Sequence, residues 1–247
     1  MNENRDDIQD RELTFFYAPD LTPQSQTILL SREESHHARR VLRKHRDDPI
    51  GLTNGTGLLA RARIQAIRPS GIQCLVESIV PHSPPQRSIH VGLALIRPNR
   101  MDWAIEKLTE LGVHSIHPLV TEFTTTPTFK RNHLERIAIS ALKQSKRAFL
   151  PILNDPLPFR EWINRTRLDN ERIGYIAHWM PDAASPAPVD LQVGSVYLAV
   201  GPEGGFSETE IRLARRNGFQ TLKLQEHTLR SETAAVVAVT LIKFLFL

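Results

Sequence analysis

The sequence of 247 residues has almost no cysteine and no long hydrophobic run. Its single cysteine, Cys74, cannot form a disulfide within the chain, which is typical of a reducing compartment. The first twelve residues are polar and acidic, so they lack the apolar core of a signal peptide. The apolar stretch 234–247 contains Lys243 and is shorter than the about 20 residues that span a membrane. We therefore expect a buried helix there and a cytoplasmic protein without a membrane anchor.

Metal-ligand patterns are also missing. His36 and His37 are adjacent, so they cannot face one metal from a regular helix, and no cysteine or carboxylate stands at ligand spacing. The excess of positive charge is small, with 31 Lys and Arg against 27 Asp and Glu. This balance permits a polyanionic partner but does not establish one. We expect no metal cofactor.

Short strand-like runs dominate the segment 13–82, which follows a tail, 1–12, that we expect to be flexible. The runs are 14–17, 50–54, 58–67 and 72–80, and turn residues separate them at 54–57 and 69–71. A capping-box pattern at 31–34 predicts a helix that continues to Lys44. Several short strands and one helix predict a small β-barrel domain.

Three prolines within 81–85 indicate a stiff linker, so we place the domain boundary between 82 and 83. The segment 83–247 alternates between two patterns. Strands are predicted at 89–96, 113–120, 173–178 and 196–200, and helices at 100–111, 131–149, 208–217 and from Ser231 onward. This alternation predicts an α/β domain with a parallel sheet and helices on both faces.

A glycine-rich loop, Gly201-Pro202-Glu203-Gly204-Gly205, follows the buried strand 196–200. A capping-box pattern at 207–210 then opens a helix. Ligands of open α/β sheets bind at the carboxyl ends of strands, where glycines let the backbone approach them. The loop has neither the Gly-Lys-Ser/Thr of a P-loop nor the dinucleotide fingerprint. A tight turn is the alternative, but three glycines at the end of a buried strand favour a ligand loop.

A second polar segment, 224–235, leads into the C-terminal helix. We expect Ser231 to cap this helix and Glu232 to be stabilised by its dipole. Neither role explains Arg230, because a cation is disfavoured beside a helix N-terminus. A positive charge at this point could face an anionic substrate or a developing oxyanion.

The segments 201–207 and 229–234 together resemble the paired signature of the RsmE family of ribosomal RNA methyltransferases. These SPOUT-class enzymes methylate N3 of a uridine in small-subunit rRNA. Weaker likenesses lie elsewhere in the chain, at 106–113, at 144–147, and in the N-terminal domain at 36–43 and 55–57. The sequence departs from the family at 121–124, where Glu-Arg-Ser is usual, and at 47–49.

The resemblance implies a trefoil-knotted SPOUT domain after an N-terminal PUA-like barrel, assembled as a homodimer. It also implies S-adenosylmethionine as cofactor and 16S rRNA of the small ribosomal subunit as partner. The residues expected to hold the cofactor are Leu198, Val200, Gly201, Glu203, Gly204, Gly205, Leu224, Leu229, Ser231 and Ala234. Arg230 and Glu232 are the candidate catalytic residues, Arg230 beside the target base or its phosphate and Glu232 as a positioning group or general base.

Basic residues recur at positions that suggest an RNA-binding surface, although each cluster alone could be a solvated face. The expected RNA contacts are His37, Arg39, Arg40, Arg43, Arg61, Arg63, Arg100, Arg136, Lys143 and Arg147. Two other functions stay open. The protein could be an RNA-binding module without catalysis, or another SPOUT enzyme that modifies transfer RNA or a ribose 2′-hydroxyl.

Overall fold

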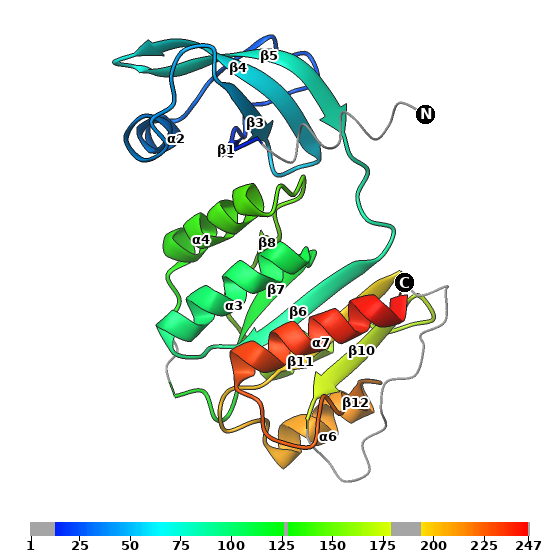
Figure 1. The fold of residues 1–247 in the computed structure, drawn as a ribbon. Coiled ribbons are helices and arrows are strands. Elements are labelled where there is room, and N and C mark those ends of the chain that lie inside the picture. The colour runs from blue at the N-terminus through cyan, green and yellow to red at the C-terminus, as the bar shows by residue number, and fades with distance from the viewer. Residues whose placement is uncertain (1–12, 126–127, 179–193, 247) are drawn as a thin grey trace. The chain divides into compact units, whose positions relative to one another are not determined.

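The computed structural model describes residues 13–125, 128–178 and 194–246 (Figure 1). The chain divides into two compact units. Unit 1 comprises Met1–Pro84 and Ile139–Leu150, and unit 2 comprises Pro85–Ala138 and Pro151–Leu247. The sequence had placed 139–150 in the second domain, whereas its contacts place this segment in unit 1.

Unit 1 is built on a five-stranded sheet. Its strand order is β1 (Phe15–Tyr17), β3 (Pro49–Thr53), β4 (Leu58–Arg68), β5 (Gly71–Pro81) and β2 (Thr27–Leu29). All pairs are antiparallel except β1 with β3. Phe16, Ile50 and Ile64 are fully buried in its core. Cys74 is buried beside them, and burial raises the pKa of its thiol to about 12, so it is a structural residue.

The first helix of unit 1 is shorter than predicted. α2 (Arg32–His36) begins after Ser31, whose Oγ accepts a hydrogen bond from the backbone N–H of Glu34, as the capping box predicts. A single π-helical turn, η1 (His37–Val41), follows. The predicted continuation to Lys44 is wrong, because Arg43 adopts φ +51° and leaves the helical conformation.

The segment 139–150 includes the end of α4 (Arg131–Gln144). The prediction that this helix runs to residue 149 is wrong, because Lys146 adopts φ +54° just beyond its end. The residues after Lys146 instead form hydrogen bonds with other parts of unit 1. The Leu150 N–H donates to the Gly55 carbonyl at 2.8 Å, and the Thr53 hydroxyl donates to the Arg147 carbonyl at 3.1 Å.

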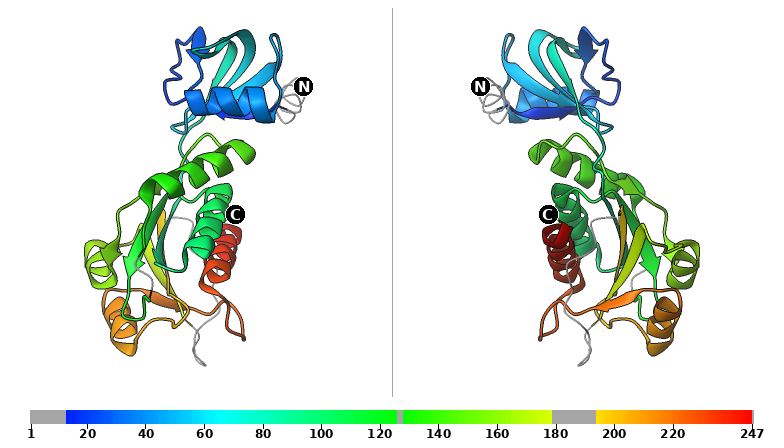
Figure 2. Two further views of the ribbon diagram at one scale, coloured as in Figure 1. Left: turned by 90° about the vertical axis from the view of Figure 1, so that its left-hand side faces the viewer. Right: turned by 90° about the vertical axis from the view of Figure 1, so that its right-hand side faces the viewer.

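Unit 2 contains a sheet in which every pair is parallel, as predicted. Its strands in spatial order are β12 (Gln220–Leu222), β10 (Arg172–Ala177), β11 (Ser195–Val200), β6 (Ser88–Ala94), β7 (Ser115–Val120) and β8 (Ile152–Leu153), and β9 (Leu157–Pro158) also pairs with β7. Helices cover both faces (Figure 2). α3 (Pro98–Leu111) and α7 (Ser231–Phe246) lie on one face, and α5 (Phe159–Arg165) and α6 (Glu208–Arg216) lie on the other.

Local signals explain the helices that frame the site. α3 ends at Gly112, which adopts the left-handed conformation at φ +69°. α6 begins with the predicted capping box, in which Ser207 and Glu210 each bond to the other's backbone N–H. Among the described helices, none combines the length and apolar character needed to cross a membrane.

Candidate functional site

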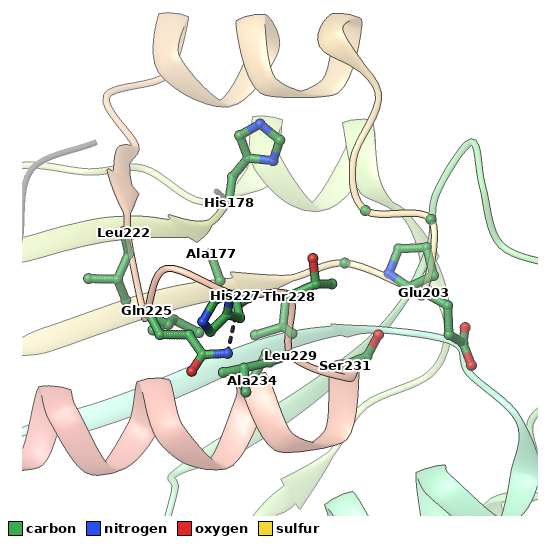
Figure 3. A pocket seen from close by; sticks show the side chains of 16 residues that line it. Ala177, His178, Glu203, Leu222, Gln225, His227, Thr228, Leu229, Ser231 and Ala234 are labelled. Carbon is green, nitrogen blue, oxygen red and sulfur yellow. Dashed lines mark hydrogen bonds between the residues drawn. The ribbon is translucent and has the colours of Figure 1, made fainter. Parts of the chain in front are cut away.

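Three neighbouring strands of unit 2 end side by side. Ala177 at the end of β10 is in register with Val200 of β11 and with Leu222 of β12. Residues at these strand ends, in the glycine loop and in the segment before α7 line a cavity of about 320 Å³ (Figure 3). In Figure 3, His178 lies on one side of the cavity, and Leu229 and Ala234 lie on the other, beside α7. This is the sheet edge at which the sequence predicts a ligand.

The glycine loop forms one wall of the cavity. The Gly205 N–H donates to the Pro202 carbonyl at 2.9 Å and closes a tight turn. Gly205 adopts φ +73°, a conformation that glycine tolerates best. A side chain at Gly204 would come within 3.2 Å of Phe123. The loop therefore presents mainly backbone to the cavity.

The segment between β12 and α7 forms the opposite wall. Leu224, Gln225, His227, Thr228 and Leu229 line the cavity. The Gln225 amide donates to the His227 carbonyl at 2.6 Å and holds the bend of the segment (Figure 3). The two segments that sequence analysis singled out thus converge on one cavity.

Three buried side-chain oxygens have no hydrogen-bond partner in the described part of the protein. One is Oε2 of Glu34 in unit 1, and the other two are the Ser231 hydroxyl and Oε2 of Glu232 in unit 2. The prediction that Ser231 caps α7 is wrong, because α7 begins at Ser231 and its first hydrogen bond joins the Ala234 N–H to the Arg230 carbonyl at 2.7 Å. Since buried polar groups are usually bonded, the Ser231 hydroxyl at the cavity wall is free to bond a ligand.

Arg100, in the first turn of α3, connects the glycine loop to α7. Its Nη1 donates to Oε1 of Glu203 in the glycine loop at 2.8 Å, and its Nε lies 3.7 Å from Oε1 of Glu232 in α7. The side chain of Glu232 is only 11% exposed. The ion pair therefore compensates a nearly buried carboxylate and fixes the loop relative to α7. The sequence suggests an RNA contact for Arg100 but not this role, because its partners lie more than a hundred residues away along the chain.

Arg230 is exposed at the N-terminus of α7 and does not line the cavity. The charged group within ion-pair distance of Glu232 is Arg100. Within the described residues, no hydrogen bond or ion pair joins Glu232 to Arg230, so no contact supports the prediction that Glu232 positions Arg230. Arg230 instead stands beside the cavity with its guanidinium accessible from solvent.

Most of the predicted cofactor residues line the cavity: Val200, Gly201, Glu203, Gly204, Gly205, Leu224, Leu229, Ser231 and Ala234. Leu198 does not, since it is fully buried in β11, two residues before the cavity. Sequence analysis missed Ala177, His178 and Leu222. Burial, together with the charge of Arg215, lowers the pKa of His178. Only the pairing of β10 with both β11 and β12 could have revealed these residues.

The predicted RNA contacts fall into two groups. Several are already paired: Arg61 and Arg63 share Glu77, Lys143 bonds to buried Glu34, and Arg100 forms ion pairs with Glu203 and Glu232. Burial lowers the pKa of Arg147, and the ring of His37 packs edge-on against Phe16. The predicted RNA-contact residues that are exposed and have no carboxylate partner among the described residues are Arg39, Arg40, Arg43 and Arg136.

Over residues 13–125, 128–178 and 194–246, no group of three or more His, Cys, Asp or Glu side chains could hold a metal ion. His90 of β6 and His117 of β7 lie within hydrogen-bond distance of serine hydroxyls instead. Nδ1 of His90 lies 2.7 Å from the Ser115 hydroxyl, which in turn lies 2.8 Å from Nε2 of His117.

Comparisons with known proteins match both units. A family model described as an RNA methyltransferase domain matches residues 82–243, and one described as an RNA methyltransferase PUA domain matches residues 30–77. Two relatives are called ribosomal RNA small subunit methyltransferase E. The one from Synechocystis sp. is 30% identical over 89% of this chain and 73% of its own length. The one from Buchnera aphidicola (Schizaphis graminum) is 29% identical over 90% and 92%.

A solved structure gives the same result. The ribosomal RNA small subunit methyltransferase E of Neisseria gonorrhoeae, bound to S-adenosyl methionine, is 27% identical to this chain. It superposes with a TM-score of 0.86 over 95% of this chain and 98% of its own. The likeness therefore extends over both units, and sequence motifs and fold agree.

Proposed function

The chain belongs to the RNA methyltransferase family that includes ribosomal RNA small subunit methyltransferase E, and we propose that it transfers a methyl group from S-adenosylmethionine to N3 of a uridine in 16S rRNA. The observation that carries the proposal is the convergence of the glycine loop and the segment 224–234 on one cavity. A binding module without catalysis would not need this cavity beside Arg230.

The residues of the cavity suit the cofactor. Its volume of about 320 Å³ falls in the range of ligand pockets, roughly 300–1,000 Å³. Leu222, Leu224 and Leu229 offer an apolar wall, and the glycine loop offers backbone groups. The Ser231 hydroxyl lacks a partner that a polar ligand would supply. We therefore assign cofactor binding to the glycine loop and the segment 224–234.

When bound, S-adenosylmethionine supplies an activated methyl group. The protein must then orient the uracil and accept the proton that N3 loses as the N–CH₃ bond forms. We assign Arg230 to an anionic group of the RNA, either the phosphate or the charge that develops on the base. The free Oε2 of Glu232 is the proposed proton acceptor, and Arg100 holds the other oxygen of that carboxylate.

We also propose that the C-terminal segment forms the family's knot. β12 is the edge strand next to β10, yet α7 packs against β11, β6 and α3. Residues 223–230 must therefore pass the carboxyl ends of β10 and β11. An experimental chain trace in which this segment runs outside the loop 201–207 would contradict the knot.

The exposed side of α3 and α7 suits a second copy of the chain. Trp103 is 40% exposed and Phe244 is 74% exposed, on helices that pack against each other. Where such side chains form a contiguous apolar patch, the patch marks an interface. We propose a homodimer through this face, and expect Phe244→Ser to shift the protein toward monomer in sedimentation equilibrium. An unchanged oligomeric state would reject this interface.

The proposed reaction can be tested by its product. The protein is incubated with labelled S-adenosylmethionine and isolated small subunits, and the rRNA is digested to nucleosides for mass spectrometry. We expect 3-methyluridine in the 16S rRNA. A methylated ribose, or methylation of transfer RNA alone, would reject the proposed substrate.

A further inference from the structure

Unit 1 has a hollow of its own, where α2 and η1 meet the turn between β4 and β5. Its volume is about 200 Å³, which is small for a cofactor but sufficient for a single anionic group. The lining residues are Arg32, Ser35, His36, Arg39, Arg40, Arg68, Pro69, Ser70 and Gly71. We call this hollow the arginine recess.

The recess concentrates uncompensated positive charge. Four arginines and no Asp or Glu line it, which gives its lining a charge of +4. The whole chain has a formal net charge of only +4. Within the described residues, none of the four arginines has a carboxylate within ion-pair distance. Arg61 and Arg63, on the neighbouring part of β4, share Glu77. Charge compensation is thus available in unit 1 but is absent at the recess.

Local structure holds the floor of the recess in place. The Ser35 hydroxyl donates to the Leu30 carbonyl at 3.1 Å and accepts from the Ile72 N–H at 3.0 Å. These bonds tie α2 to β5. A side chain at Gly71 would approach this hydroxyl to 3.3 Å, so glycine keeps the recess open.

Arg39 and Arg40 come from the π-helical turn η1. The Leu42 N–H donates to the His37 carbonyl at 3.1 Å, five residues earlier, and this wider turn alters the direction of the side chains. Turns of this kind are rare and occur often at functional sites. Arg68 belongs to the end of β4, so the four arginines line the recess from three elements, α2, η1 and β4.

We propose that the arginine recess binds a backbone phosphate of the RNA substrate and serves as an anchor in unit 1 apart from the cavity of unit 2. Planar guanidinium groups bind phosphate in a bidentate manner, and an anion would relieve the repulsion among the four arginines. The inference rests on the proposed function, because it needs an RNA substrate. It adds Arg32 and Arg68 to the contacts expected from sequence.

The test compares Arg39→Ala and Arg68→Ala with Arg46→Ala. Arg46 lies in the same unit, outside the recess, with a side chain that is 75% exposed. Binding of a 16S rRNA transcript is measured across a salt series. We expect the dissociation constant of each recess variant to rise about tenfold, and the slope of log K against log salt to fall by about 1. Arg46→Ala should keep the wild-type slope and the wild-type kcat.

Recess variants that bind the transcript as Arg46→Ala does would overturn the proposal. A titration with inorganic phosphate, followed by the amide resonances of Ser70 and Gly71, separates RNA from free phosphate. Phosphate binding at the recess without any effect of Arg39→Ala or Arg68→Ala on RNA would also overturn it. If the wild type makes no 3-methyluridine but its RNA binding depends on both arginines, the proposed function fails and the recess stands.

Discussion

The cavity of unit 2 and the arginine recess of unit 1 differ in how their charges are compensated. Beside the cavity, Arg100 donates a hydrogen bond to Glu203 and forms an ion pair with Glu232. At the recess, four arginines lack carboxylate partners among the described residues. A ligand of the cavity is thus held by shape and backbone, while a ligand of the recess is held by charge. Salt should weaken the second kind of binding far more than the first.

The largest effect is expected at Arg230, the exposed arginine that we assign to an anionic group of the RNA. Arg230→Ala should lower the methyl-transfer rate about 100- to 1,000-fold, as loss of a group that stabilises developing charge does. Cofactor affinity by calorimetry should stay the same, because Arg230 does not line the cavity. The control is Arg212→Ala on α6, whose partner is Glu208. A full rate in Arg230→Ala would remove Arg230 from the mechanism.

A fall in pH should lower the stability of unit 2 more than that of unit 1. Burial lowers the pKa of His90 to about 4, helped by the charges of His114, His117 and Arg172, and burial lowers that of His117 to about 4. Between the unfolded value of 6.5 and about 4, the unfolded chain therefore binds more protons. The free energy of unfolding of unit 2 should therefore fall through this window as pH drops.

Hydrogen exchange at pH 7 and pH 4.5 measures this loss in each unit separately. His117→Gln should flatten the pH dependence of unit 2, and His45→Gln, at an exposed side chain of unit 1, should not. A loss of protection in unit 1 before unit 2 would contradict the assignment.

Removing the bridge between the glycine loop and α7 should have an intermediate effect. Arg100→Met keeps the aliphatic stem but leaves Glu232 without its cation, so stability should fall by about 1–3 kcal/mol. Adding Glu232→Gln should recover much of this loss. Additive effects of the two substitutions in a double-mutant cycle would show that the ion pair contributes nothing.

The smallest effect is expected in the glycine loop. Gly205→Ala finds open space but must adopt φ +73°, which should weaken cofactor binding by about tenfold. Gly194→Ala is the matched control, since Gly194 has no such φ and only distant neighbours. Equal affinities in calorimetry would show that the loop tolerates a side chain.

Sequence predicted the features that depend on local signals. The parallel sheet, the capping box at Ser207 and the end of α3 at Gly112 follow from periodicity and capping residues. Local signals did not predict the features that depend on contacts between residues far apart in the sequence. α4 ends early because the chain after Lys146 bonds to β3 and the turn after it, and no pattern near residue 146 announces this.

The site shows the same limit. The two chain segments that line the cavity carry recognisable residues, so sequence located them. Arg100 looked like an RNA contact because its partners, Glu203 and Glu232, lie far along the chain. Arg32 and Arg68 drew no attention because only the fold brings α2 to the β4–β5 turn.

A crystal structure of the protein with S-adenosylmethionine tests the central claim most directly, namely that the strand-end cavity of unit 2 holds the cofactor. We expect the cofactor between the loop 201–205 and the segment 224–229, with a polar atom bonded to the Ser231 hydroxyl. Cofactor bound at any other place, with this cavity empty, would contradict it.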